Sequence, residues 1–138
     1  MKWTAEQEQA IYKEGTNIIV SAGAGSGKTA VLSERVLRKV KDGIDIRKIL
    51  ILTFTNEAAG EMKNRIRKKI KKAGILEQME YIDSAYITTF DSFALSVVRK
   101  YHYILGISKN IGIIDSSIIN LEKNRILEEI FLELYTKK

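Results

Sequence analysis

The sequence predicts an α/β domain in which helices flank a parallel sheet, and three observations lead to that prediction. Residues 17–21 and 49–53 are short apolar runs rich in β-branched side chains, which is typical of buried parallel strands. Residues 86–89 make a third, plausible strand. Helical spacing follows each of the three runs, and a strand–helix–strand order in one sheet requires a right-handed crossover. We therefore expect ligands at the edge formed by the carboxyl ends of the strands.

The loop after the first predicted strand has the composition of a phosphate-binding loop. Residues 22–29 read Ala-Gly-Ala-Gly-Ser-Gly-Lys-Thr, which fits the pattern of that loop. Gly23, Gly25 and Gly27 allow the backbone to adopt positive φ and to come close to a ligand. The amides of such a turn, with the N-terminus of the following helix, can hold a polyphosphate. A flexible glycine-rich linker is the alternative, but a linker does not require the sequence Gly-Lys-Thr at the start of a helix.

Two side chains of this loop carry the predicted chemistry. Lys28 would reach the β- and γ-phosphates, and Thr29 would offer its hydroxyl to Mg²⁺, so both are candidate catalytic residues. The candidate nucleotide-binding residues of the loop are Ala22, Gly23, Ala24, Gly25, Ser26, Gly27, Lys28 and Thr29.

Gln7, ahead of this loop, has two interpretations. Thr4 precedes the first predicted helix, which ends near Gly15, and Gln7 three residues later completes the pattern of a capping box. The side-chain amide of Gln7 could instead read adenine beside the phosphate loop. One amide has few donors and acceptors, so both roles could hold only in part.

Composition excludes several kinds of site. The 138 residues are enough for one domain with a real core. The chain has no cysteine and one histidine, His102, which excludes disulfides, thiolate metal sites and histidine clusters. No stretch approaches the length of a membrane span, and residues 1–20 lack the apolar core of a signal peptide. We therefore expect a cytoplasmic protein that does not contact a membrane.

The net charge of +6 is unevenly distributed along the chain. Residues 63–72 hold seven basic residues and no acid. Such a local field suits a polyanion such as DNA, whereas a solvated helix face that simply carries lysines is the alternative. The sequence leaves both interpretations open.

Apolar stripes mark the buried faces of the predicted helices. In the helix of about residues 27–41, Leu32, Val36 and Val40 recur every four residues. The next helix follows Asn56, a good N-cap. Its stripe consists of Met62, Ile66, Ile70 and Ala73.

A repeated Thr-Phe pair ends the second and third predicted strands. Thr53-Phe54 and Thr89-Phe90 are each followed by a hydroxyl or amide side chain and by a helix. At a ligand-binding edge, Phe54 could stack a base while nearby amides hold phosphate; burial in the core is the alternative. In the second copy, Thr89, Asp91 and Ser92 could be nothing more than helix caps.

The last part of the chain gives one ambiguous signal. Residues 111–115 resemble the apolar strand ending in Asp that places Mg²⁺ in nucleotide hydrolases. Ser116 and Ser117 follow, so the usual water-orienting Glu is missing, and we interpret Asp115 as a helix cap. The final helix, about residues 118–135, has a wide apolar face that indicates a neighbour.

Four segments, taken in order, resemble the first motor domain of superfamily 1 DNA helicases of the UvrD/Rep type. Gln7 lies in the pattern of the Q motif, and residues 22–29 match motif I. Residues 53–62 match motif Ia, and residues 89–93 match motif Ib. Four motifs in order are far more specific than any one of them.

Within this group, residues 17–35 and 98–103 resemble the AddA family of bacterial helicase–nuclease subunits, and the likeness extends over essentially the whole chain. The resemblance implies an incomplete RecA-like P-loop NTPase fold. It also implies an ATP-driven motor that moves on single-stranded DNA, unwinds duplex ends and works with an AddB-like second subunit in double-strand-break repair.

The motifs also imply roles for particular residues. Gln7 would contact adenine, and the loop would bind the phosphates of ATP and Mg²⁺ through Thr29. The residues implied to meet DNA are Phe54, Thr55, Asn56, Thr89, Phe90 and Ser92. We expect residues 1–112 to be the N-terminal part of motor domain 1A, and residues 113–138 to be a connector and the start of an inserted helical subdomain.

The sequence departs from the family pattern at two positions and in extent. Ala30 stands where UvrD-type motors often carry Arg, and Asp91 stands where motif Ib often has His. The Asp-Glu pair of motif II, the later helicase motifs and the nuclease domain are missing from these 138 residues. Motor ATPases need a metal-holding acid and a water-orienting residue, so we expect little or no activity from this portion alone.

Overall fold

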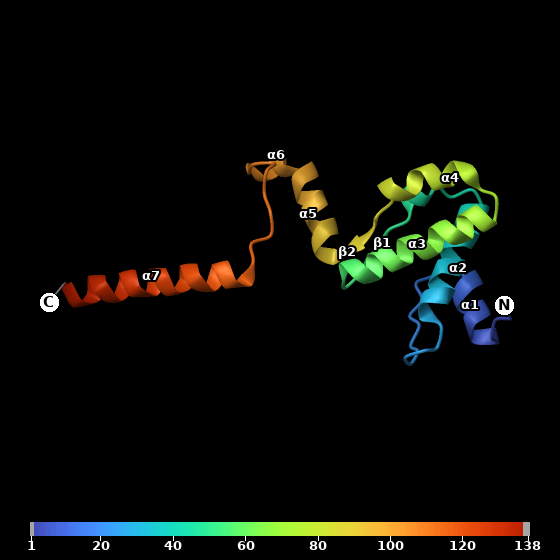
Figure 1. The fold of residues 1–138 in the computed structure, drawn as a ribbon, viewed down its shortest axis with the longest axis horizontal. Coiled ribbons are helices and arrows are strands. Elements are labelled where there is room, and N and C mark those ends of the chain that lie inside the picture. The colour runs from blue at the N-terminus through green and yellow to red at the C-terminus, as the bar shows by residue number, and fades with distance from the viewer. Residues whose placement is uncertain (1, 137–138) are drawn as a thin grey trace. The chain divides into compact units, whose positions relative to one another are not determined.

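A computed structural model describes residues 2–136, and the chain divides into two units between Phe93 and Ala94. The first unit contains α1 (Ala5–Tyr12), α2 (Lys28–Lys41), the 3₁₀ turn η1 (Ile46–Lys48), β1 (Ile51–Thr53), α3 (Asn56–Lys72), α4 (Leu76–Tyr81), the 3₁₀ turn η2 (Ile82–Ser84) and β2 (Ile87–Thr89). The helix α5 (Phe90–Lys100) crosses the division, and α6 (His102–Leu105) and α7 (Ser116–Thr136) follow. Figure 1 labels these elements. The domain boundary predicted after residue 112 stays a prediction.

Two of the three predicted strands form a parallel pair. The register places Ile51 opposite Ile87 and Thr53 opposite Thr89. Both strands are shorter than predicted. The connection from β1 to β2 runs through α3 and α4, and Figure 1 shows α3 beside both strands. The predicted mixed α/β class with a parallel sheet is therefore confirmed for the described residues, in which the sheet has two strands.

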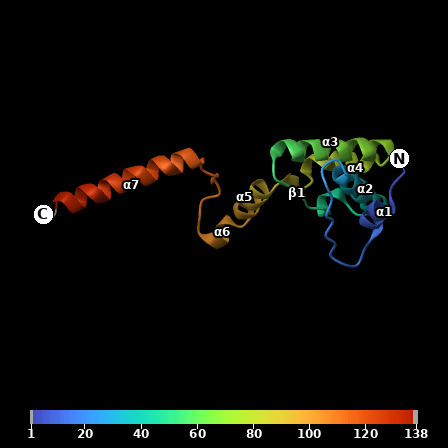
Figure 2. The same ribbon diagram turned by 90° about the horizontal axis from the view of Figure 1, so that it is seen from below.

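The prediction of a buried strand at residues 17–21 is wrong. The segment is coil between α1 and α2 (Figures 1 and 2), and the side chain of Ile19 is 99% exposed. A strand that is apolar on both faces needs a neighbouring strand to pair with and helices over both faces. Within residues 2–136 the sheet contains only β1 and β2, and neither pairs with this segment. The predicted strand–helix–strand unit through α2 is therefore not formed here.

The core of the first unit lies between α2, α3, the two strands and the α4 region. Met62, Ile66 and Ile70 form the predicted buried stripe of α3, while Ala73 is exposed and Ala59 is buried instead. On α2, Val36 and Val40 are buried as predicted, but Leu32 is 38% exposed. The buried cluster consists of Val36, Leu37, Val40, Ile46, Ile51, Met62, Ile66, Ile70, Ile82, Ala85 and Ile87. This core anchors β1 and β2, whose carboxyl ends carry the repeated Thr-Phe pairs.

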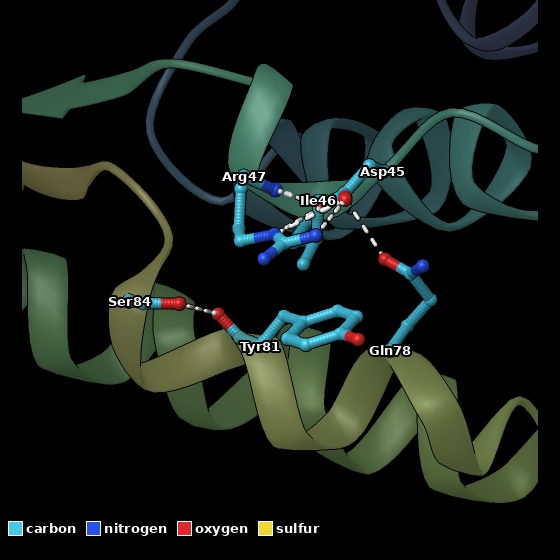
Figure 3. Close-up of polar contacts among 6 residues, drawn as sticks. All are labelled: Asp45, Ile46, Arg47, Gln78, Tyr81 and Ser84. Carbon is cyan, nitrogen blue, oxygen red and sulfur yellow. Dashed lines mark hydrogen bonds and ion pairs between the residues drawn. The ribbon is translucent and has the colours of Figure 1, made fainter.

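Polar contacts hold η1, just before β1, against α4 (Figure 3). The Ile46 N–H donates a hydrogen bond of 2.9 Å to the Gln78 side chain. The Arg47 guanidinium lies over the Tyr81 ring, 3.8 Å from its centroid, and donates to the Asp45 carboxylate. These contacts fix the start of β1 to the crossover that leads to β2.

We expect the contact between Asp45 and Arg47 to be sensitive to acid. The side-chain and main-chain N–H groups of Arg47 donate to the carboxylate, which lowers the pKa of Asp45 from its ordinary 3.8 to about 2. Because the folded pKa is the lower one, the contact stabilises the fold above about pH 4 and is lost as the pH falls toward 2. An NMR titration should show this low pKa of Asp45, and Arg47→Ala should return it toward 3.8. An Asp45 pKa that is the same in the wild type and in Arg47→Ala would contradict this contact.

The second unit contains helices with little buried surface. The Arg99 guanidinium donates to the Ile111 carbonyl, which ties α5 to the connector before α7. The Ser117 hydroxyl donates to the Asp115 carboxylate, and the Ser117 N–H donates to it at 2.8 Å. Both hydrogen bonds lower the pKa of Asp115, and the second confirms it as the cap of α7. On α7, Ile126 and Ile130 are 44% and 49% exposed, so the predicted apolar face is uncovered. Among the described residues, the helices contain no apolar stretch that could span a bilayer.

Candidate nucleotide and DNA sites

The phosphate loop takes the backbone shape that its glycines predict at two of three positions. Gly25 and Gly27 have φ of +76° and +84°, in the left-handed region that side chains avoid, whereas Gly23 does not have positive φ. A Cβ added at Gly23 would meet nothing within 4 Å, so the structure shows no need for glycine at this position. Gly27 is the N-cap of α2, and its carbonyl accepts from the Val31 N–H at 2.9 Å. The first amides of α2 therefore have no helical partner and are available to an anion.

The side chain of Lys28 turns back onto the loop. Its Nζ donates to the carbonyls of Ala22 at 2.6 Å and Gly23 at 2.8 Å. The Ser26 hydroxyl donates to the same Gly23 carbonyl at 2.7 Å. The ammonium thus lies inside the turn, held by neutral acceptors, and a phosphate oxygen would offer it a charged acceptor instead. Thr29, the next residue, is exposed at the N-terminus of α2.

Gln7 joins the first helix to this loop. Its Oε1 accepts from the Thr4 N–H at 3.0 Å, and the Thr4 hydroxyl accepts from the Gln7 N–H at 3.3 Å, which confirms the capping box. The other end of the amide, Nε2, donates to the Ser26 carbonyl at 3.1 Å. One side chain therefore caps α1 and contacts the phosphate loop at once, since its acceptor and its donor serve different partners. Contact with adenine stays a prediction.

A pocket of about 650 Å³ lies beside the loop, between α1, α2 and the coil before the loop. Its lining includes Gln7, Ala10, Ile18, Val20, Lys28 and Leu32. The volume is in the range of pockets that hold small ligands, and mostly apolar walls with a few polar groups are usual for them.

The two Thr-Phe pairs meet at the carboxyl edge of the sheet. Because Thr53 lies opposite Thr89 in the parallel register, the following rings are neighbours, and the ring centroids of Phe54 and Phe90 are 6.1 Å apart. Phe54 is 93% exposed and Phe90 is 55% exposed. Burial of Phe54 in the core, the alternative at this position, is therefore wrong. The edge presents two adjacent aromatic rings to solvent.

Hydroxyl groups beside these rings begin the two helices. Thr55, and not Asn56, is the N-cap of α3, since its hydroxyl accepts from the Ala58 N–H at 3.1 Å. Thr89 caps the start of α5, where its hydroxyl accepts from the Ser92 N–H at 3.2 Å and donates to the Ser92 hydroxyl at 2.9 Å. The capping interpretation is therefore confirmed for Thr89, whereas Ser92 supplies the N–H that is capped. Contact of either residue with DNA stays a prediction. Asp91 lies exposed in the first turn of α5, where the helix dipole favours an acid.

The basic run on α3 is partly neutralised by neighbouring acids. Arg65 pairs with Glu61 at 2.7 Å on the same helix, and Arg67 pairs with Asp83 at 2.6 Å. Lys69 pairs with Glu34 of α2. The exposed lysines of the run are Lys68, Lys71 and Lys72. The charge available to a polyanion is therefore smaller than the sequence indicates, and the DNA interpretation of the run stays a prediction.

Sequence reasoning missed Arg35, on α2. Its guanidinium donates to the carbonyls of Ala10 at 2.8 Å, Ile11 at 3.3 Å and Lys13 at 2.8 Å, all at the end of α1. The sequence held one signal for this residue. Arg35 lies seven positions, or about two helical turns, after Lys28 and therefore on the same face of the predicted helix.

Comparison with known proteins identifies the family. The UvrD/REP helicase N-terminal domain matches residues 3–138, which is nearly the whole chain. The chain belongs to the UvrD/REP helicase family. Membership implies a P-loop helicase fold, of which the structure shows the loop, its helix and two parallel strands.

Relatives within the UvrD/REP family are helicase–nuclease subunits of the AddA type. The chain is 40% identical to the ATP-dependent helicase/nuclease subunit of this type from Heliobacterium modesticaldum, over 99% of the chain and 10% of that protein. It is 43% identical to the corresponding protein of Alkaliphilus metalliredigens, over 96% of the chain and 12% of that protein. The chain therefore spans about a tenth of the length of these relatives.

Proposed function

We propose that this chain is the N-terminal, ATP-binding portion of an ATP-dependent DNA helicase–nuclease subunit. The main support is that the chain contains a phosphate loop and that its residues 3–138 match the UvrD/REP helicase N-terminal domain. The relatives are named as ATP-dependent helicase/nuclease proteins, which supports ATP as the nucleotide and DNA unwinding with nuclease action as the activity of the full-length protein.

In this proposal the phosphate loop holds Mg²⁺-ATP. The amides of Gly25, Gly27 and Lys28 bind phosphate oxygens, and Lys28 moves its ammonium from the loop carbonyls to the β- and γ-phosphates. The exposed hydroxyl of Thr29 fits one ligand position of the metal. Mg²⁺, when bound, would neutralise charge on the β- and γ-phosphates. Gln7 contacts the adenine.

The carboxyl edge of the sheet is the proposed track for single-stranded DNA. Phe54 and Phe90 would stack bases, since both rings are exposed and adjacent. Thr55, Asn56, Thr89 and Ser92 would hydrogen-bond the strand, using groups at the N-termini of α3 and α5. ATP and DNA would thus be bound on elements of one unit.

We also propose a partner subunit and a cellular location for the full-length protein. The relatives are named as subunits, which supports a second protein of the AddB kind in the assembly. The DNA substrate would be duplex ends processed for recombinational repair, which places the protein with the chromosome in the cytoplasm. We also propose that these 138 residues alone have little or no ATPase activity, because a motor ATPase needs a metal-holding acid and a water-orienting residue in addition to the phosphate loop.

The test is ATP hydrolysis by the full-length protein that contains this sequence, with and without single-stranded DNA. A motor should hydrolyse ATP much faster when DNA is present. A nucleotide- or DNA-binding module would bind its ligands without turnover, and an unrelated P-loop NTPase would hydrolyse at a rate indifferent to DNA. Either of these results would contradict the proposal.

A further inference from the structure

We infer that Arg35 is a positioning residue that fixes Gln7 against the phosphate loop and so contributes to the preference for adenine. The inference rests on the proposed ATP site. Within residues 2–136, Arg35 makes no hydrogen bond to the loop or to Gln7, although it lines the same pocket as Gln7 and Lys28. Its hydrogen bonds within residues 2–136 all go to main-chain carbonyls at the end of α1.

The first step is that α1 does not supply its own C-terminal partner. A helix ends with carbonyls that have no helical N–H partner, and a cation there is favourable. The last turn of α1 has no basic residue. Arg35 supplies that cation from α2, and its planar fork reaches three carbonyls that a lysine ammonium could not span with the same geometry.

The second step is that α1 is held at two separate points, one on the phosphate loop and one on α2. Near the loop, Gln7 Nε2 donates to the Ser26 carbonyl at 3.1 Å. Toward the other end of α1, Arg35 binds Ala10, Ile11 and Lys13, and Ala10 and Ile11 are the buried residues of α1. Two attachments fix the angle between the helices, whereas one would let α1 rotate about it. An eight-residue helix is marginal on its own, so these attachments add to the packing of Ala10 and Ile11 in fixing α1.

The third step is that the position of Gln7 is tightly limited. A Cβ built on Gly27 would lie 3.4 Å from Gln7 Nε2, so the amide packs directly against the turn. A small rotation of α1 would carry the amide away from the loop and from a base beside it. Loss of Arg35 should therefore weaken discrimination between bases and leave the contacts to the triphosphate in place.

The experiment compares ATP with GTP in equilibrium binding and in steady-state hydrolysis by the full-length protein. We expect Arg35→Lys to reduce the preference for ATP over GTP about fivefold, roughly the effect of one lost hydrogen bond. The KM for ATP should rise and kcat should change less. In a Gln7→Ala background, Arg35→Lys should produce no further loss of preference, because the two residues act as one unit. Arg125→Lys is the matched control, since Arg125 lies on α7 and pairs with Glu129 of the same helix at 3.0 Å.

The outcomes separate this inference from the proposed function. If the wild-type protein binds no ATP, both fail. If it prefers ATP and Arg35→Lys keeps the full preference, Arg35 does not position Gln7 and the inference alone fails. If Arg35→Lys lowers binding of ATP and GTP equally, or lowers kcat without changing the preference, its role is only structural, which also overturns the inference.

Discussion

Substituting Lys28 by Ala should reduce DNA-stimulated ATP hydrolysis by ~100- to 1,000-fold, the usual effect of removing one preorganised group that stabilises charge in the transition state. The ammonium of Lys28 lies within the phosphate loop, bound to the carbonyls of Ala22 and Gly23. In the proposal this ammonium leaves the two carbonyls and stabilises charge on the β- and γ-phosphates during hydrolysis. The measurement is kcat for ATP hydrolysis by the full-length protein at saturating single-stranded DNA.

The matched control for this prediction is Lys41→Ala. Lys41 is exposed at the last position of α2, so the substitution removes the same charge from the same helix but far from the loop. Its hydrolysis rate should match that of the wild type. Equal losses in the two variants would mean that general charge, and not the position of Lys28 in the loop, accounts for the effect.

Substituting Phe54 by Ala should weaken binding of single-stranded DNA by ~1–3 kcal/mol, or about 5- to 150-fold. The ring is 93% exposed and contacts Phe90, so it has little part in the core and its loss should leave the fold intact. The measurement is the dissociation constant for a short single-stranded oligonucleotide at fixed salt, because salt alone changes such affinities strongly.

Leu76→Ala provides the control for Phe54. Leu76 is 66% exposed in the same unit, at the start of α4 and away from the Thr-Phe pairs. Removing it deletes exposed apolar surface without removing a ring from the proposed track, so affinity for DNA should not change. Unchanged affinity in Phe54→Ala would exclude base stacking by this ring, and unfolding of that variant would show that Phe54 supports the fold after all.

Local signals in the sequence predicted local structure well. The capping box of Thr4 and Gln7, the positive φ of Gly25 and Gly27, and the cap at Asp115 depend on a few neighbouring residues, and the structure has all of them. The parallel order of β1 and β2 was also predictable, because a helical crossover between two apolar runs leaves few other arrangements.

Features that depend on distant residues were not predictable from the same patterns. Residues 17–21 have the apolar composition of a central strand, yet composition cannot supply the neighbouring strands that such a strand pairs with. The exposure of Phe54 follows from what packs above the sheet edge, which a pattern of residues does not specify. The pairing of Lys69 with Glu34 joins α3 to α2 across 35 positions, so the sequence showed the positive charge without its partner.

Amide chemical shifts of the phosphate loop, recorded while Mg²⁺-ATP is added, test the central claim most directly. If the loop binds the triphosphate, the N–H signals of Gly25, Gly27 and Lys28 should move together and saturate, and the Lys28 side chain should leave its carbonyl partners. Inorganic triphosphate should move the same signals, since the backbone grips phosphate and not the base. Loop signals that stay fixed while ATP shifts others elsewhere in the molecule would contradict the account.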